Sequence, residues 1–401
     1  DGGYIVGGYF KSSSIDLGNG ISLTNKGSTS APDGMIIKYN VAGEVKWAEG
    51  IGGSDYDYIE SVSETSDGGY IVGGYFYSRS IDLGTGISLT NKGYTGAPDG
   101  MIIKYNVAGE VEWAEGIGGT SDDRISSVSE TRDGGYIVGG YFKSSSIDLG
   151  TGISLTKKGS SDDGMIIKYN AAGEVEWAEG IGGTDNDYIE SVSETSDGGY
   201  IVVGDFRSSI DLGTGISLTN KGYNDGMLIK LEKIERPTPT VIKAYGIGGT
   251  SSDPINSVSE TSDGGYIVGG YFSSSSIDLG NGISLTNKGI TNSSDGMIIK
   301  YNARGEVEWA EGIGGTSNDY IESVSETSDG GYIVGGYFRS SRIDLGNGIS
   351  LINKGSTSYA DGMIIKYNAR GEVEWAEGIG GTSNDYIESV SETSDGGYIV
   401  G

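Results

Sequence analysis

The chain contains no cysteine and no histidine. Without cysteine, disulfides, thiol nucleophiles and thiolate metal sites are excluded. Without histidine, the commonest general base and the commonest transition-metal ligand are missing. A metal site would have to use oxygen ligands, which suit Ca²⁺ better than zinc, so we expect no required cofactor and only Ca²⁺ as a candidate ion.

Positive charge is also scarce, because 27 lysines and arginines stand against 56 aspartates and glutamates, for a formal net charge of −29. Phosphate binding needs a cationic face, so we expect no nucleic acid partner. Cations, basic proteins and neutral glycans are compatible with this charge. No apolar run approaches the ~18 residues of a membrane-spanning helix, so we expect no membrane span.

A tandem repeat of about 66 residues fills the chain. The phrase DGGYIVGGYF or a close variant recurs at spacings of 66, 66, 64, 66, 66 and 66 residues. All six methionines share one repeat position, and the five tryptophans share another, where the fourth repeat has Lys243. We predict a single domain, 1–401, built from these units: 1–66, 67–132, 133–196, 197–262, 263–328, 329–394 and the partial repeat 395–401.

Each repeat contains four segments with strand character. In the second repeat these are 58–65, 70–76, 101–105 and 111–114, and the turn sequence Ser-Asp-Gly-Gly joins the first two into a hairpin. No segment has a helical apolar period, and glycine is too frequent for helices. Four antiparallel strands at this period predict an all-β fold, a β-propeller of six four-stranded blades, with seven blades as the alternative. A solenoid is the main competitor, but 66 residues is long for a solenoid repeat.

The two ends of the chain are expected to close the ring. If the segment equivalent to 58–65 forms the innermost strand of each blade, the chain begins at the second strand of a blade. The inner strand of that first blade would then come from 386–393. The N- and C-terminal strands would then share one blade. The segment 395–401 duplicates 1–7 and would be surplus, so the tail is displaced or the parent protein has more blades. Since the chain begins inside a repeat, we expect a monomeric domain of a longer chain.

Several repeat motifs resemble a known family. The motifs are a G-x-x-x-W segment, a GG-x-x-x-D turn, a DGG hairpin turn and an acidic, glycine-rich stretch, here 15–20. Over the whole chain they resemble the bacterial β-propeller repeats called SBBP repeats. The resemblance implies an extracellular or cell-surface bacterial protein and little functional detail.

One aspartate precedes the predicted inner strand of every repeat. In a propeller such a position lies around the mouth of the central channel, where six carboxylates would attract Ca²⁺ or a basic group. The alternative is that each aspartate caps its own turn through backbone N–H groups. The candidate metal ligands are Asp57, Asp123, Asp187, Asp253, Asp319 and Asp385.

Two further repeated features have structural explanations. A lysine of the third strand, such as Lys104, is expected to form a cross-strand ion pair with the glutamate of the fourth, such as Glu112. The phrase at 65–70 loosely resembles the Asp-box of sialidases, but a turn-forming Asp-Gly-Gly explains it without catalysis.

Differences between repeats are more informative about binding than shared positions, since loops on a rigid scaffold usually carry function. The variable loops are 28–32, 94–98, 160–162, 223–224, 290–294 and 356–360, and the fourth repeat has an unusual segment at 231–240. We predict a non-catalytic extracellular or cell-surface module for binding, adhesion or spacing, with a protein or glycan ligand. The alternatives are a carbohydrate-binding or carbohydrate-active propeller, since two carboxylates suffice for glycoside hydrolysis, and a Ca²⁺-stabilised structural element.

Overall fold

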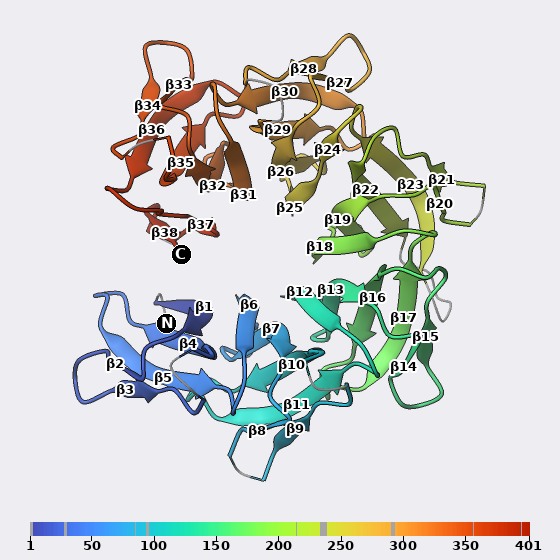
Figure 1. The fold of residues 1–401 in the computed structure, drawn as a ribbon, viewed down its shortest axis with the longest axis vertical. Helices are drawn as coiled ribbons and strands as arrows, with labels where there is room; N and C mark the ends of the chain where they lie inside the picture. Colours follow the sequence, from blue (N-terminus) through green and yellow to red (C-terminus); the bar gives the residue numbers. More distant parts are fainter. Residues whose placement is uncertain are drawn as a thin grey trace. The chain divides into compact units, whose positions relative to one another are not determined.

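A computed structural model describes residues 3–27, 30–84, 86–93, 96–213, 215–232, 239–289, 293–355, 357–393 and 395–401. Within these ranges the regular elements are all β-strands (Figure 1). No helix that could span a membrane occurs in the described part of the chain. The fold class is the predicted one, an all-β propeller of six blades built on a four-stranded antiparallel pattern.

The second blade shows this pattern completely. Its strand order is β6-β7-β10-β11, and each strand runs antiparallel to its neighbour. A small hairpin, β8–β9, which the sequence pattern did not predict, is inserted between β7 and β10. The bounds are β6 Asp57–Glu64, β7 Tyr70–Phe76, β8 Ser80–Asp82, β9 Ser88–Thr90, β10 Asp99–Tyr105 and β11 Val111–Ile117.

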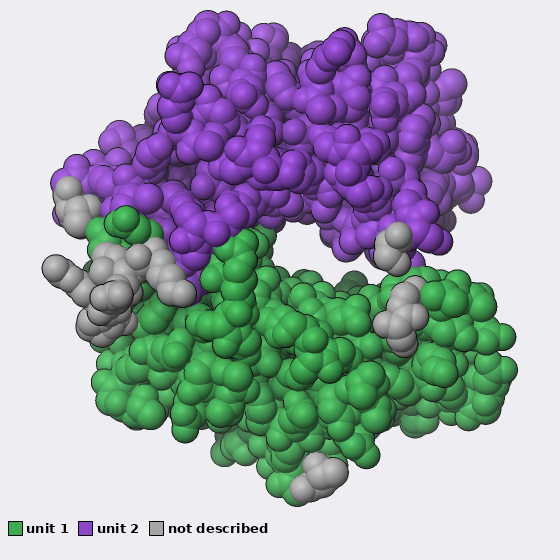
Figure 2. Space-filling view, turned by 180° about the vertical axis from the view of Figure 1, so that it is seen from behind, with its two compact units in different colours: residues 1–194, 232–240 green, residues 195–231, 241–401 purple. Residues whose placement is uncertain are grey.

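The chain divides into two compact units (Figure 2). Unit 1 comprises residues 1–194 and 232–240, and unit 2 comprises 195–231 and 241–401. The single domain over 1–401 stays a prediction from the sequence.

Unit 1 contains the first three sheets and one further strand. Besides the second blade, one sheet contains β1 Tyr4–Phe10, β4 Asp33–Tyr39 and β5 Val45–Ile51, and another contains β12 Asp123–Glu130, β13 Tyr136–Phe142, β16 Asp163–Tyr169 and β17 Val175–Ile181. The further strand is β18 Asp187–Glu194. The small hairpins are β2 Ser14–Asp16 with β3 Ser22–Thr24 and β14 Ser146–Asp148 with β15 Ser154–Thr156.

Unit 2 repeats the arrangement. One sheet contains β19 Tyr200–Phe206, β22 Asn224–Glu232, β23 Thr240–Ile247 and β24 Ser252–Asp253. The next contains β25 Ile255–Glu260, β26 Tyr266–Phe272, β29 Asp295–Tyr301 and β30 Val307–Ile313, and the third contains β31 Asp319–Glu326, β32 Tyr332–Phe338, β35 Asp361–Tyr367 and β36 Val373–Ile379. The small hairpins are β20 Ile210–Asp211 with β21 Ser217–Leu218, β27 Ser276–Asp278 with β28 Ser284–Thr286, β33 Arg342–Asp344 with β34 Ser350–Ile352, and β37 Val390–Glu392 with β38 Tyr398–Val400.

Hydrophobic cores form between neighbouring blades. Ile71 and Ile102 of the second blade pack in one buried cluster with Ile125 and Val128 of β12. The first glycine of YIVGG permits this approach, because a Cβ on Gly73 would lie 3.0 Å from Cγ2 of Ile125. Gly73 therefore marks a close approach of one blade to the next.

The pairing at the ends of the chain differs from the expectation that both ends share one blade. β37 pairs with β38, in the register Val390↔Val400, and the sheet that contains β1 has the order β1-β4-β5. The segment 395–401 is therefore the second strand of its own hairpin. A hairpin between neighbouring segments closes a short loop and loses less chain entropy than pairing between distant segments.

The variable loops lie partly outside the described residues. Residues 28, 29, 94, 95, 290–292 and 356 of the predicted binding loops, and 233–238 of the unusual segment 231–240, are not described.

Candidate functional site

Tyrosines of the first and second strands of a blade lie opposite each other. In the second blade Tyr58 pairs with Tyr75, and their ring centroids are 4.9 Å apart. The pair Tyr320 and Tyr337 has the same spacing, 4.9 Å. We name this set, together with one arginine that replaces a tyrosine, the tyrosine row: Tyr9, Tyr58, Tyr75, Arg124, Tyr141 and Tyr188 in unit 1, and Tyr271, Tyr320, Tyr337 and Tyr386 in unit 2.

The row continues from one blade to the next within each unit. In unit 1 the rings of Tyr141 and Tyr188 meet edge-on, with centroids 4.6 Å apart. In unit 2 Tyr271 meets Tyr320 at 4.5 Å and Tyr337 meets Tyr386 at 4.6 Å, both edge-on. Edge-on contact is favourable for aromatic rings, so the rings hold one another in fixed orientations.

Arg124 replaces a tyrosine in the middle of the unit 1 row. Its guanidinium carbon lies 4.4 Å from the ring centroid of Tyr75, 5.9 Å from that of Tyr77 and 5.8 Å from that of Tyr141. Its Nη2 donates a hydrogen bond of 2.9 Å to the Tyr77 hydroxyl. Its Nε is buried and has no hydrogen-bond partner among the described residues.

The row is partly open to solvent. Tyr9 is 50% exposed and Tyr386 is 43% exposed, while the other members of the row are half-buried. Burial raises the pKa of Tyr75 and of Tyr141, so these hydroxyls stay protonated at neutral pH. The row therefore offers ring faces, hydroxyl groups and one guanidinium, a set suited to binding rather than to proton transfer.

Both tyrosine positions change at the start of unit 2. Asp205 occupies the second-strand position and Pro254 the first-strand position. Asp205 is buried, and burial raises its pKa to about 6. The row is thus interrupted there, and a partner that needs continuous rings would contact the other blades.

Two glutamates accompany the row in unit 2. Oε2 of Glu322 accepts a hydrogen bond of 2.8 Å from the side-chain amide of Asn256. Burial, and then the charge of Glu388, raises the pKa of Glu322 to about 7. Burial also raises the pKa of Glu388. One carboxyl of this pair is therefore partly protonated at neutral pH.

The predicted metal ligands are mainly turn caps in the structure. Asp57 has no exposed surface, and its Oδ2 accepts hydrogen bonds from the Ser78 hydroxyl at 2.7 Å and the Gly53 backbone at 2.9 Å. Burial raises the pKa of Asp57 to about 6, although these hydrogen bonds lower it. The turn bond recurs in every later repeat, where the acceptors are Asp123, Asp187, Asp253, Asp319 and Asp385.

Among the described residues no group of three or more acidic side chains is placed to hold a metal ion. Cation binding by the six aspartates therefore stays a prediction.

A second buried aspartate occurs in each repeat, and the sequence pattern did not single it out. Oδ2 of Asp99 accepts a hydrogen bond of 2.7 Å from the Lys92 backbone, while its Oδ1 has no hydrogen-bond partner within the part of the chain that the structure describes. Burial, together with the charge of Asp123, raises the pKa of Asp99 to about 6, although the Lys92 bond lowers it. The repeated phrase Asp-Gly-Met marks this aspartate in every repeat, but the phrase does not indicate that its side chain is buried. The set is Asp33, Asp99, Asp163, Asp225, Asp295 and Asp361.

The predicted lysine–glutamate pairs are confirmed and are more buried than expected. Nζ of Lys104 lies 3.2 Å from Glu112 and 3.0 Å from Asp67, and the lysine side chain is 2% exposed. Asp67 also accepts from the Thr65 hydroxyl and the Gly69 backbone, and its pKa falls to about 2. The aspartate of the Asp-box-like phrase thus organises a turn and neutralises a buried lysine.

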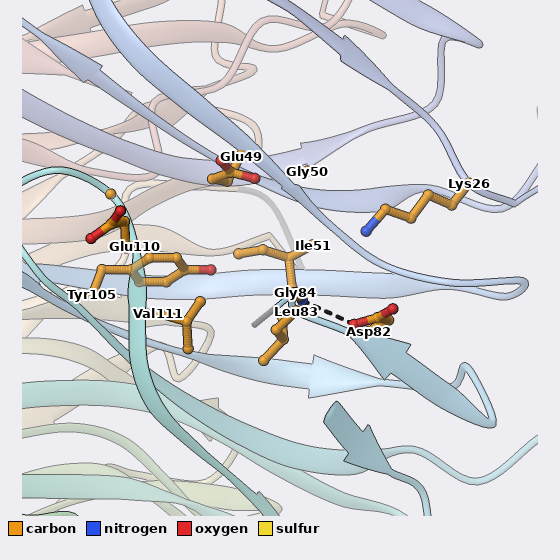
Figure 3. A pocket seen from close by; sticks show the side chains of 11 residues that line it. Lys26, Glu49, Gly50, Ile51, Asp82, Leu83, Gly84, Tyr105, Glu110 and Val111 are labelled. Carbon is orange, nitrogen blue, oxygen red and sulfur yellow. Dashed lines mark hydrogen bonds between the residues drawn. The ribbon is translucent and has the colours of Figure 1, made fainter. Parts of the chain in front are cut away.

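A hollow of about 330 Å³ lies between the β8–β9 hairpin and strands β5 and β11. Figure 3 shows Glu49 and Tyr105 around it, Lys26 to one side, and the hydrogen bond of 2.9 Å from the Gly84 backbone to Asp82. Burial raises the pKa of Glu49, and the charge of Lys26 lowers it. The same relationship recurs in other repeats, between Glu115 and Lys92 and between Glu311 and Lys288. The glutamate–lysine relationship is therefore a feature of the blade rather than of one site.

No family model matches this chain. An uncharacterized WD repeat-containing protein of Acanthamoeba polyphaga mimivirus is 22% identical over 465 residues, which cover 96% of this chain and 32% of the viral protein. Regulatory protein FlaEY of Caulobacter vibrioides is 20% identical over 367 residues, 87% of this chain and 36% of that protein. The chain thus spans about a third of the length of these relatives, and the resemblance to SBBP repeats stays a prediction.

Solved structures with low sequence identity were also found. Sqt1 from Chaetomium thermophilum has a TM-score of 0.46 at 8% identity, covering 98% of this chain and 88% of that one. The Neurospora crassa Pan2 WD40 domain has a TM-score of 0.40 at 11% identity, covering 84% and 83%. The periplasmic gluconolactonase PpgL of Pseudomonas aeruginosa has a TM-score of 0.39 at 10% identity, covering 96% and 98%.

Proposed function

We propose that this chain is a non-catalytic binding module that recognises a protein partner through the tyrosine row. The observation that carries the proposal is the set of contacts around Arg124, which lies among Tyr75, Tyr77 and Tyr141 on a partly exposed surface. Tyrosine and arginine are enriched among the residues that dominate binding energy at protein interfaces. Rings already held by neighbouring rings lose little conformational entropy when a partner binds.

The charge of the chain favours one class of partner. A net charge of −29 attracts basic surfaces and accelerates their encounter. The motif resemblance supports a bacterial cell surface or the extracellular space as the location. A role as a spacer or as a Ca²⁺-stabilised element of a surface assembly would use the same blades without the tyrosine row, so the experiment must test the row itself.

Selection from a displayed random-peptide library tests the proposal. The selected peptides should bind the wild-type chain and lose at least about tenfold in affinity with Tyr75→Ser or Arg124→Ala. Val107→Ser is the control, because Val107 is 63% exposed and lies outside both the row and the variable loops. Peptides that bind all of these variants equally would show that the row is not the recognition surface.

Glycan binding is the second candidate function, and the glutamate pair of unit 2 favours it. Aromatic faces stack on sugar rings, while Glu322 and Asn256 supply polar groups for hydroxyls. A glycan array probed with and without Ca²⁺ decides between the candidates. Specific glycan binding that is lost in Tyr337→Ser would favour this function over protein recognition.

A further inference from the structure

The fourth repeat departs from the others along one strand. β23 carries the sequence VIKAY at 241–245, where the second, third, fifth and sixth repeats have VEWAE. Ile242 thus replaces a glutamate, Lys243 replaces the tryptophan, and Tyr245 replaces a second glutamate. Because the other repeats are nearly identical, they show what this strand would contact if it kept the common sequence.

In the first, second, fifth and sixth repeats the indole fills a space beside the next blade. Trp47 lies edge-on to Tyr70 with ring centroids 5.6 Å apart, and it covers Gly109, where a Cβ would lie 2.7 Å from the indole. The equivalent tryptophan–tyrosine distances are 5.6 Å for Trp113, 5.7 Å for Trp309 and 5.6 Å for Trp375. The indole is therefore a repeated part of the packing between blades.

In the fourth repeat Tyr245 fills part of this space. Its ring lies 5.9 Å from Tyr301 and covers Gly305, as Trp47 covers Gly109. Tyr266, the counterpart of Tyr70, has no ring stacked on it in the described part of the chain, and Lys230 lies 6.0 Å from its centroid. The half of the indole space above Tyr266 is therefore not filled by an aromatic side chain of this repeat.

A pocket of about 260 Å³ occupies this place, within unit 2. Its apolar lining comes from Ile201, Leu228, Ile242, Tyr245 and Tyr266. None of these residues belongs to the tyrosine row. Apolar cavities of roughly 150 Å³ already accept a single aromatic ring, so this volume is sufficient for a two-ring group.

The charged groups of the pocket balance and are already partnered. Lys230 lies 2.8 Å from Asp197, and Lys243 donates to the Arg304 carbonyl at 2.6 Å. Glu260 accepts hydrogen bonds from the backbone and hydroxyl of Ser196. No charge of the lining requires an ionic ligand, and the lysine near Tyr266 can also favour an aromatic face.

We propose that this pocket binds a neutral planar aromatic ring system of the size of indole, in the space that a tryptophan fills in the other repeats. The ring can belong to a free small molecule or to a tryptophan side chain of another polypeptide. Both sources share the same recognition chemistry, and the site is independent of the tyrosine row.

Isothermal titration with indole and with N-acetyltryptophanamide tests the proposal. We expect one site per chain, with a dissociation constant of about 0.1–1 mM for a ligand of this size. Binding of indole alone identifies a small-molecule site, and binding of the amide identifies a site that accepts a peptide-borne ring. No heat of binding from either probe at concentrations up to about 5 mM would overturn the proposal.

Two designed variants make the test specific. The triple variant Ile242→Glu, Lys243→Trp and Tyr245→Glu restores the VEWAE sequence, which already folds in four other repeats, and should abolish binding. The reverse exchange, Glu308→Ile, Trp309→Lys and Glu311→Tyr in the fifth repeat, should open a second pocket and raise the stoichiometry from one to two. Binding that persists in the first variant would place the ligand elsewhere and refute the proposal.

Discussion

The guanidinium of Arg124 lies 4.4 Å from the ring centroid of Tyr75, although the two residues belong to different blades. In the other described repeats the position of Arg124 holds a tyrosine or, once, a proline. A cation among aromatic faces is attracted by the negative ring faces, and partial burial strengthens the attraction. This contact makes one junction between blades different from the rest and sets up the first prediction.

Arg124→Ala should lower the free energy of unfolding by about 1–2 kcal/mol, because it removes the contacts with the rings and the hydrogen bond to Tyr77. Urea denaturation measured by circular dichroism gives the change. Arg304→Ala is the control, since Arg304 is 82% exposed and its guanidinium lies 3.7 Å from the Glu306 carboxylate, a loose surface ion pair. An equal effect of both substitutions would mean that the ring contacts of Arg124 contribute nothing.

The two glycines of YIVGG should respond differently to alanine. A Cβ on Gly74 would lie 2.1 Å from the backbone oxygen of Tyr58, which cannot move without breaking the β6–β7 pairing. A Cβ on Gly73 would meet the side-chain methyl of Ile125 at 3.0 Å, and the fourth repeat carries buried Val203 at this position. We expect Gly74→Ala to cost more than about 2 kcal/mol and Gly73→Ala less than about 1 kcal/mol. Similar midpoints of thermal unfolding for both variants would contradict this explanation.

Stability should rise as the pH is lowered from neutral to mildly acidic values. Asp57, Asp99, Asp225 and Asp319 have pKa values of about 6 in the folded chain against 3.8 for the free side chain. The folded state therefore binds their protons more tightly, so ionising them as the pH rises from about 4 to 6 disfavours folding.

The turn aspartates limit this gain at low pH. Asp67, Asp133 and Asp263 have pKa values of about 2, so their contribution is complete above about pH 4 and is lost as the pH falls toward 2. We expect the highest melting temperature near pH 4–5, measured by differential scanning calorimetry. Asp99→Asn should raise the melting temperature at about pH 7.5 and flatten its pH dependence, because it removes one buried charge. A melting temperature that falls steadily from about pH 7.5 to 5 would refute the assignment.

Ca²⁺ tests the sequence-based metal prediction directly. If the aspartates that begin the inner strands hold a cation, Ca²⁺ should raise the melting temperature relative to EDTA by ligand linkage. Mg²⁺ at the same ionic strength is the control for general charge screening. Identical melting curves in Ca²⁺ and EDTA would leave these aspartates with the turn-capping role alone.

Local features of the blade were predictable because they depend on neighbouring residues. The strand at 70–76, the turn around Asp67 and the pairing of Lys104 with Glu112 follow from residues that are adjacent in the sequence or across one hairpin. The hairpin β8–β9 was missed, since its strands are only three residues long and give too short an alternating pattern. Burial of Asp99 was missed because a polar residue at the start of a strand normally indicates solvent.

By itself the sequence determined the repeat period, the all-β class, the hairpins within each blade and the loss of the tryptophan at Lys243. These properties depend on strand alternation, turn residues and comparison between repeats. Only the tertiary structure decided the contact of Arg124 with Tyr75, the burial of the two aspartate sets, the pairing of β37 with β38 and the pocket beside Tyr266. The physical reason is that these features arise where one blade packs against the next, or where one strand can pair with more than one other strand. Residues about one repeat apart meet there, and their contacts depend on shape and burial, which a local sequence pattern does not contain.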